Sequence, residues 1–84
     1  MSKHDQLNFL IDTLLSLKDK KEIYEFLLGI FTPQELEEIP TRLQIVKRLK
    51  QGLTQHQIAE ELSVGVATVT RGSKEIQKGR FQNI

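Results

Sequence analysis

Cysteine is absent from this 84-residue chain, and proline occurs only twice. Without cysteine, the protein has neither a disulfide framework nor a thiolate metal site. The two histidines, His4 and His56, lie too far apart for metal-ligand spacing, so no metal site is expected. The polar N-terminus does not resemble a secretory signal, and no apolar run is long enough to cross a membrane. The length suits one small domain, so we expect a cytoplasmic protein with residues 1–84 in a single domain and no membrane partner.

The chain also lacks the side-chain arrangements on which most enzymes rely. It has no cysteine nucleophile, no histidine beside a carboxylate on one helical face, and no glycine-rich loop for phosphate. The adjacent carboxylates Glu60 and Glu61 would point to different faces of a helix, so they do not form a catalytic pair. We therefore expect no catalytic residues and no enzymatic activity.

Charge is unevenly distributed along the chain. Residues 1–41 carry four basic and eight acidic side chains, whereas residues 42–84 carry eight basic and three acidic ones. The small overall charge of +1 hides this difference. A basic half that contains the candidate DNA-binding segment is typical of a surface that binds a polyanion such as DNA. The alternative is an uneven scatter of charge without function.

Apolar residues recur at helical spacing, and no segment alternates as a strand does. Asp19, Thr32 and Thr54 have the character of helix N-caps, each with Glu or Gln three residues later. Pro40 is expected to end or kink a short helix near Ile39. The pattern predicts an all-α fold with six helices, at about 5–18, 20–31, 33–39, 41–51, 55–62 and 66–78.

The segment from Thr54 to Lys78 is the most informative part of the sequence. It reads as two short helices joined by the turn Ser63-Val64-Gly65, in which Gly65 can take a positive φ. Small and apolar residues fall where such a crossed pair needs them, at Ile58, Ala59, Leu62, Val64 and Val69. This arrangement is typical of the DNA-binding helix-turn-helix.

The two N-terminal helices carry more apolar side chains than the rest of so short a chain can cover: Leu7, Phe9, Leu10, Ile11, Leu14, Leu15, Leu17, Ile23, Phe26, Leu27, Leu28, Ile30 and Phe31. A symmetric dimer would cover them and would read two DNA half-sites. We therefore expect residues 1–31 to form a homodimer interface and residues 54–79 to form the DNA-binding helix-turn-helix. Residues 32–53 would be helices that connect the two, and residues 80–84 a frayed tail. The alternative is a monomeric bundle.

Four segments resemble the Trp repressor family: FTPQE (31–35), TRLQIVKRL (41–49), GLTQHQIAEEL (52–62) and GVATVTRGS (65–73). The segment 14–31 is more similar to the uncharacterised YerC/YecD-type branch of that family. The resemblance implies an all-α, intertwined homodimer that binds double-stranded operator DNA. In the best-known members it also implies L-tryptophan as a corepressor.

Carried over position by position, the resemblance implies a DNA-binding set at the start of the first motif helix and in the N-terminal half of the second: Gln55, His56, Gly65, Val66, Ala67, Thr68 and Thr70. We also expect Arg71, Ser73 and Lys74 of the second motif helix to bind DNA. Short apolar side chains can touch thymine methyl groups, and hydroxyl or amide groups can bond phosphates or base edges. The alternative for Thr68 and Thr70 is that they only solvate an exposed helix face. His56 stands where tryptophan-responsive members have a longer arginine.

The resemblance also implies a corepressor pocket at Thr32, Arg42, Arg71, Gly72 and Glu75. Two guanidinium groups could grip a carboxylate and sandwich an aromatic ring. The alternative is that Arg71 binds phosphate, Arg42 pairs with a carboxylate, and Gly72 permits close helix packing. Glu75 also stands where the family has a serine, which weakens the expectation of tryptophan binding more than that of DNA binding.

Three functions therefore remain open at this point. The first is a repressor that binds a palindromic operator as a homodimer and is gated by an amino-acid effector, L-tryptophan. The second is a DNA-binding regulator of the YerC/YecD type that needs no effector. The third is a helical protein-interaction module that docks another regulator on its apolar face.

Overall fold

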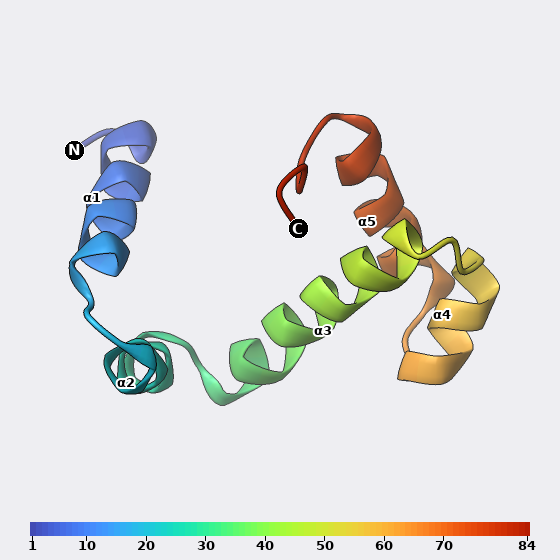
Figure 1. The fold of residues 1–84 in the computed structure, drawn as a ribbon, viewed down its shortest axis with the longest axis horizontal. Coiled ribbons are helices and arrows are strands. Elements are labelled where there is room, and N and C mark those ends of the chain that lie inside the picture. Colours follow the sequence, from blue (N-terminus) through green and yellow to red (C-terminus); the bar gives the residue numbers. More distant parts are fainter. The chain divides into compact units, whose positions relative to one another are not determined.

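A computed structural model describes residues 1–84 as five helices without a strand (Figure 1). The helices are α1 (Lys3–Ser16), α2 (Lys20–Ile30), α3 (Pro33–Lys50), α4 (Gln55–Leu62) and α5 (Val66–Gln77). The all-α prediction is confirmed, but the predicted number of six helices is wrong. None of the five is both long enough and apolar enough to cross a lipid bilayer.

The error in helix number lies at Pro40, which stands inside α3 rather than at a helix end. Proline has no amide hydrogen, so the carbonyl of Leu36 loses its intrahelical partner, at a cost of about 3 kcal/mol. Helix α3 nevertheless continues through Pro40 to Lys50. Its two buried residues, Ile45 and Val46, both follow the proline.

The local signals for helix starts are confirmed. Asp19 accepts a hydrogen bond from the amide of Glu22 at 2.9 Å. The hydroxyl of Thr32 accepts from the amide of Glu35 at 3.2 Å, and the Glu35 carboxylate accepts in return from the Thr32 amide at 2.9 Å. These bonds satisfy amide groups that a helix N-terminus otherwise leaves unpaired.

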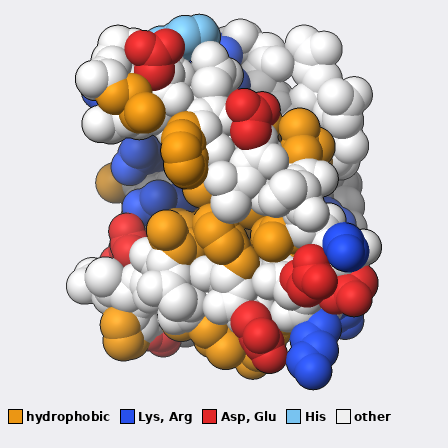
Figure 2. All heavy atoms as spheres, turned by 90° about the vertical axis from the view of Figure 1, so that its left-hand side faces the viewer, with side chains coloured by type: hydrophobic (Ala, Val, Ile, Leu, Met, Phe, Trp, Pro, Cys, Tyr) orange, Lys and Arg blue, Asp and Glu red, His pale blue; other side chains and the backbone are white.

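The chain divides into two compact units, Met1–Leu36 and Glu37–Ile84. Neither α1 nor α2, in the first unit, contains a buried residue. Hydrophobic side chains lie uncovered on the face shown in Figure 2. The large apolar side chains that remain exposed in these two helices are Leu7, Phe9, Leu10, Ile11, Leu14, Leu15, Ile23, Tyr24, Leu28 and Ile30.

The second unit contains the core of the protein. Ile45 of α3, Ile58 of α4 and Val69 of α5 are each at most 1% exposed, and Ala59 is also buried. The partly buried residues around them are Leu49, Leu53, Leu62 and Val64. One fully buried branched residue from each helix fixes α4 and α5 against α3, so the position of α5 depends on this core.

The turn between α4 and α5 has a different backbone from the one expected. Ser63, not Gly65, has the left-handed conformation, with φ of 54°. The amides of Ser63 and Val64 bond back to the carbonyls of Glu60 and Ala59 at 3.3 and 3.0 Å. The reversal therefore belongs to the C-terminal cap of α4. Gly65 instead is the N-cap of α5, with φ of −69°, so it does not use the positive φ that a glycine can take.

Two other glycines, at helix ends, have a positive φ. Gly52 and Gly79 follow α3 and α5 with φ of 92° and 95°, a backbone conformation that residues with a side chain rarely adopt. Residues 78–83 form turns, and the Lys50 ammonium donates to the carbonyl oxygens of Phe81 and Ile84. The Lys50 side chain at the end of α3 thus contacts the C-terminal tail.

Candidate nucleic-acid interface

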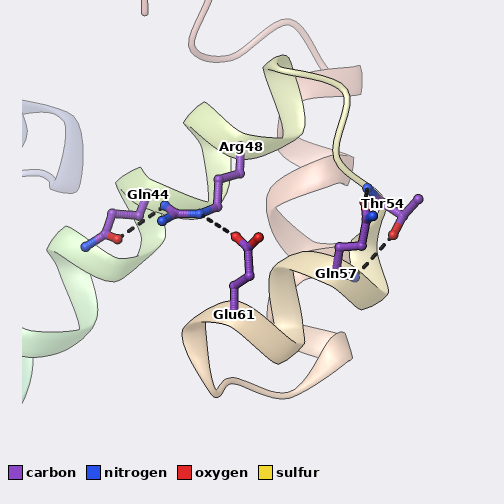
Figure 3. A network of polar contacts seen from close by, with 5 residues as sticks. All are labelled: Gln44, Arg48, Thr54, Gln57 and Glu61. Atoms are coloured by element: carbon purple, nitrogen blue, oxygen red, sulfur yellow. Dashed lines mark hydrogen bonds and ion pairs between the residues drawn. The ribbon is translucent and has the colours of Figure 1, made fainter.

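The start of α4 is fixed by a reciprocal cap. The Gln57 amide donates to the Thr54 hydroxyl at 3.2 Å, and the Thr54 amide donates to the Gln57 side-chain oxygen at 2.9 Å (Figure 3). This capping box confirms the spacing read from the sequence. It sets the first turn of α4, from which Gln55 and His56 extend.

A second contact fixes α4 against α3. Arg48 donates from Nε to the Glu61 carboxylate at 3.2 Å and from Nη1 to the Gln44 side-chain oxygen at 3.2 Å (Figure 3). An exposed pair of this kind contributes at most about 1 kcal/mol. Its main consequence is that the Arg48 charge is already compensated within the protein.

Gly72 brings α5 close to α3. A Cβ atom at this position would lie 3.2 Å from Cγ2 of Ile45 and 3.6 Å from Cδ1 of Leu49. A glycine inside a helix costs about 1 kcal/mol relative to alanine, so it needs a compensating reason. Here the close approach of the two helices supplies it, which supports the packing interpretation of Gly72.

The residues expected to bind DNA fall into two groups. Seven are exposed: His56, Gly65, Val66, Ala67, Thr68, Arg71 and Lys74. The other three, Gln55, Thr70 and Ser73, are half-buried. All ten lie in α4, α5 or the residue before α5, so the structure places them in one helix pair.

Two of the half-buried residues contact each other. The Thr70 hydroxyl lies 2.6 Å from Oε1 of Gln55, as a donor to that oxygen. It also lies 3.0 Å from the backbone oxygen of Val66, one turn earlier in α5. The sequence did not indicate this contact, because 15 residues separate Thr70 from Gln55.

Most cations of the basic half have partners within the protein. Arg42 lies 4.0 Å from Glu38, Arg48 pairs with Glu61, and Lys78 and Arg80 both pair with Glu75 at 3.4 and 3.8 Å. Lys50 donates to carbonyls of the tail. Three cations of this half have neither an ion pair nor a hydrogen bond to a carbonyl oxygen: Lys47, Arg71 and Lys74. Arg71 and Lys74 lie three residues apart on α5, the second helix of the motif.

An open hollow of about 490 Å³ runs along the exposed side of α5. Its lining combines apolar groups, one hydroxyl, three cations and one carboxylate: Val66, Ala67, Thr70, Arg71, Lys74, Lys78 and Glu75. Such a surface offers donors and positive charge to an anion and apolar contact to a base methyl group.

Two of the five residues expected in a corepressor pocket line this hollow. It contains Arg71 and Glu75, but neither Arg42 nor Gly72 lines it. Glu75 already pairs with Lys78 and Arg80, and Arg42 lies beside Glu38. The fifth residue, Thr32, belongs to the first unit, where its hydroxyl caps α3. Each of these contacts is an intramolecular role that needs no ligand. No cluster of side chains suited to a metal ion is present.

Comparison with known proteins gives one family and several relatives. Residues 5–83 match the model of the family described as Trp repressor protein. A Trp operon repressor homolog of Vibrio vulnificus is 38% identical over 69 residues, which cover 81% of this chain and 68% of the relative. A homolog of the same description from Vibrio cholerae is 47% identical over 60 residues, 69% of this chain and 58% of the relative.

An uncharacterized Bacillus subtilis protein, YerC, is 32% identical over 74 residues, which cover 88% of this chain and 71% of the relative. No solved structure matches the chain.

Proposed function

This chain belongs to the Trp repressor family, and we propose that it is a DNA-binding transcription regulator that represses by binding a palindromic operator as a homodimer. The observation that carries the proposal is the surface of α5. Arg71 and Lys74 have no ion pair there, and they lie beside the exposed Val66, Ala67 and Thr68. The unpaired cations would bind phosphate while the short side chains approach base edges.

The proposed dimer rests on the first unit. Its two helices bury none of their residues, and ten large apolar side chains remain exposed on them. A second copy covering this surface would be a symmetric partner, and a two-fold axis would present two copies of α5 to two half-sites. Palindromic operators match that symmetry.

We further propose that DNA binding does not depend on L-tryptophan. This version is favoured by the intramolecular contacts of the expected pocket residues, Arg42 beside Glu38 and Gly72 packed on Ile45. Glu75 adds a carboxylate that pairs with Lys78 and Arg80.

Titration calorimetry with L-tryptophan, repeated with indole-3-propionate, tests independence from the effector. We expect no saturable heat with either compound at millimolar concentration, in the wild type or in Arg42→Ala. Saturable micromolar binding at one site per chain, lost in Arg42→Ala, would contradict this version and support a corepressor pocket at Arg42.

Selection of duplexes from a random-sequence pool tests the DNA proposal itself. We expect an inverted repeat to be enriched by the wild-type protein without added effector. Recovery of no preferred sequence, together with no retention of DNA at low salt, would contradict the proposal.

One observation favours a second function, that of a protein-interaction module. The exposed apolar face of α1 and α2 would suit another regulator if a second copy did not cover it. Analytical ultracentrifugation distinguishes the two functions, since a stable monomer favours the protein-interaction module and a dimer favours the repressor.

A further inference from the structure

The hydroxyl of Thr70 is the starting point, since both of its neighbours are acceptors. It lies 2.6 Å from Oε1 of Gln55 and 3.0 Å from the carbonyl oxygen of Val66. A threonine hydroxyl has one proton, so that single donor is shared between two protein oxygens. Phosphate oxygens only accept hydrogen bonds, and Thr70 has no second proton to offer them.

Thr68 differs from Thr70 although both lie on α5. Its side chain is exposed and makes no hydrogen bond within the protein, whereas Thr70 is half-buried. The two threonines therefore have different donors available to DNA. Thr68 keeps a free hydroxyl proton, and Thr70 does not.

The same contact orients Gln55. A glutamine amide carries its acceptor oxygen and its NH₂ donor at opposite corners of a planar group. With Oε1 directed at Thr70, the NH₂ group is the end that remains for an external partner. Paired reading of adenine needs the oxygen and the NH₂ group together, whereas a phosphate oxygen needs only donors.

We propose that Thr70 is a positioning residue that holds the Gln55 amide with its NH₂ group towards a DNA phosphate, and that Thr70 itself donates nothing to DNA. This inference rests on the proposed DNA-binding function. It assigns the two residues one joint role in place of two separate contacts. The bond also joins α4 to α5 through side chains, so it couples the phosphate contact to the position of the second helix.

A double-mutant cycle on DNA affinity tests the inference. The variants are Thr70→Val, which removes the hydroxyl at nearly constant shape, Gln55→Ala, and the two combined. The probe is a short duplex that the wild-type protein selects from a random pool. We expect each single variant to weaken binding roughly tenfold, as loss of a hydrogen bond to a charged group does. We expect the double variant to be no weaker than either single one.

Two further variants give the matched controls. Thr70→Ser keeps the hydroxyl and should restore affinity to near that of the wild type. Thr68→Val removes an unbonded hydroxyl, and its effect should multiply with that of Gln55→Ala. If the effects of Thr70→Val and Gln55→Ala also multiply, Thr70 contacts DNA on its own and the inference is wrong.

The side-chain amide resonances of Gln55 give a readout that does not depend on DNA. In the free protein we expect Thr70→Val to shift them, and Thr68→Val and Thr70→Ser to leave them nearly unchanged. Unchanged resonances in Thr70→Val would overturn the inference while leaving the proposed function intact. Conversely, if the wild type binds no duplex, the proposed function fails and the DNA role of Gln55 fails with it, even where the resonances shift as expected.

Discussion

At the scale of single residues, the structure assigns protein-internal roles to side chains that the sequence placed in a ligand pocket. Gly72 faces Ile45 and Leu49, and Arg42 lies beside Glu38. Residue type alone could not decide between these roles and a ligand, because a glycine or an arginine suits both.

Gly72→Leu is expected to destabilise the fold by roughly 2 kcal/mol or more, since its Cβ alone would lie 3.2 Å from Cγ2 of Ile45 and the remaining carbons would need space in a packed core. Urea unfolding followed by circular dichroism measures the change. Gln77→Leu adds a leucine to the exposed side of the same helix and serves as the control. Equal stability of the two variants would contradict the packing role of Gly72.

The long-range polar contacts show what local patterns cannot reveal. Arg48 meets Glu61 across 13 residues, and Thr70 meets Gln55 across 15. No spacing rule connects such pairs, because they depend on how α4 lies against its neighbours. The basic residues could be counted from the sequence, but which of them stay unpaired could not.

At the scale of helices, local sequence signals predicted the capped helix starts correctly. They wrongly predicted that two helices, rather than one, meet at Pro40. The caps at Asp19, Thr32 and Thr54 are formed within three residues, so sequence order alone determines the partners. Pro40 has a known local cost, but α3 continues through it from Pro33 to Lys50. The positive φ likewise fell on Ser63 because the cap of α4 governs that turn.

Pro40→Ala measures whether α3 is continuous in solution. In an uninterrupted helix the substitution restores one amide hydrogen bond and relieves a clash, so stability should rise by up to about 3 kcal/mol. If a second helix began at Pro40, its missing amide hydrogen would cost nothing, and the substitution would be nearly neutral. The shift of the urea midpoint therefore separates one helix from two, and a neutral result would contradict the continuous α3.

At the scale of the whole molecule, the uncovered apolar face of α1 and α2 is the feature with the largest consequence. The amount of apolar surface could be predicted from the sequence, because thirteen apolar residues share two short helices. What covers that surface could not be predicted from the sequence, because a monomeric bundle and a dimer need the same composition. We expect the wild-type protein to sediment as a dimer of the 9.7 kDa chain.

Leu15→Glu should shift that equilibrium towards monomer, because Leu15 is 79% exposed in the single chain and a buried carboxylate without a partner is costly at an interface. Asn8→Glu adds the same side chain to α1 at an exposed polar position and is the control. A dimer unaffected by Leu15→Glu would place the interface elsewhere.

The most direct test of the DNA-binding surface is the affinity for a selected duplex as a function of salt concentration. It compares the wild type with Arg71→Ala/Lys74→Ala, and with the control Lys20→Ala/Lys21→Ala, which removes equal charge from α2. The expected result is a steep fall of wild-type affinity with salt. In the α5 variant alone, the slope of log K against log salt should be smaller by about 0.9 for each phosphate that the variant no longer neutralises. Equal slopes for both double variants, or no binding by the wild type, would contradict the assignment of α5 to DNA.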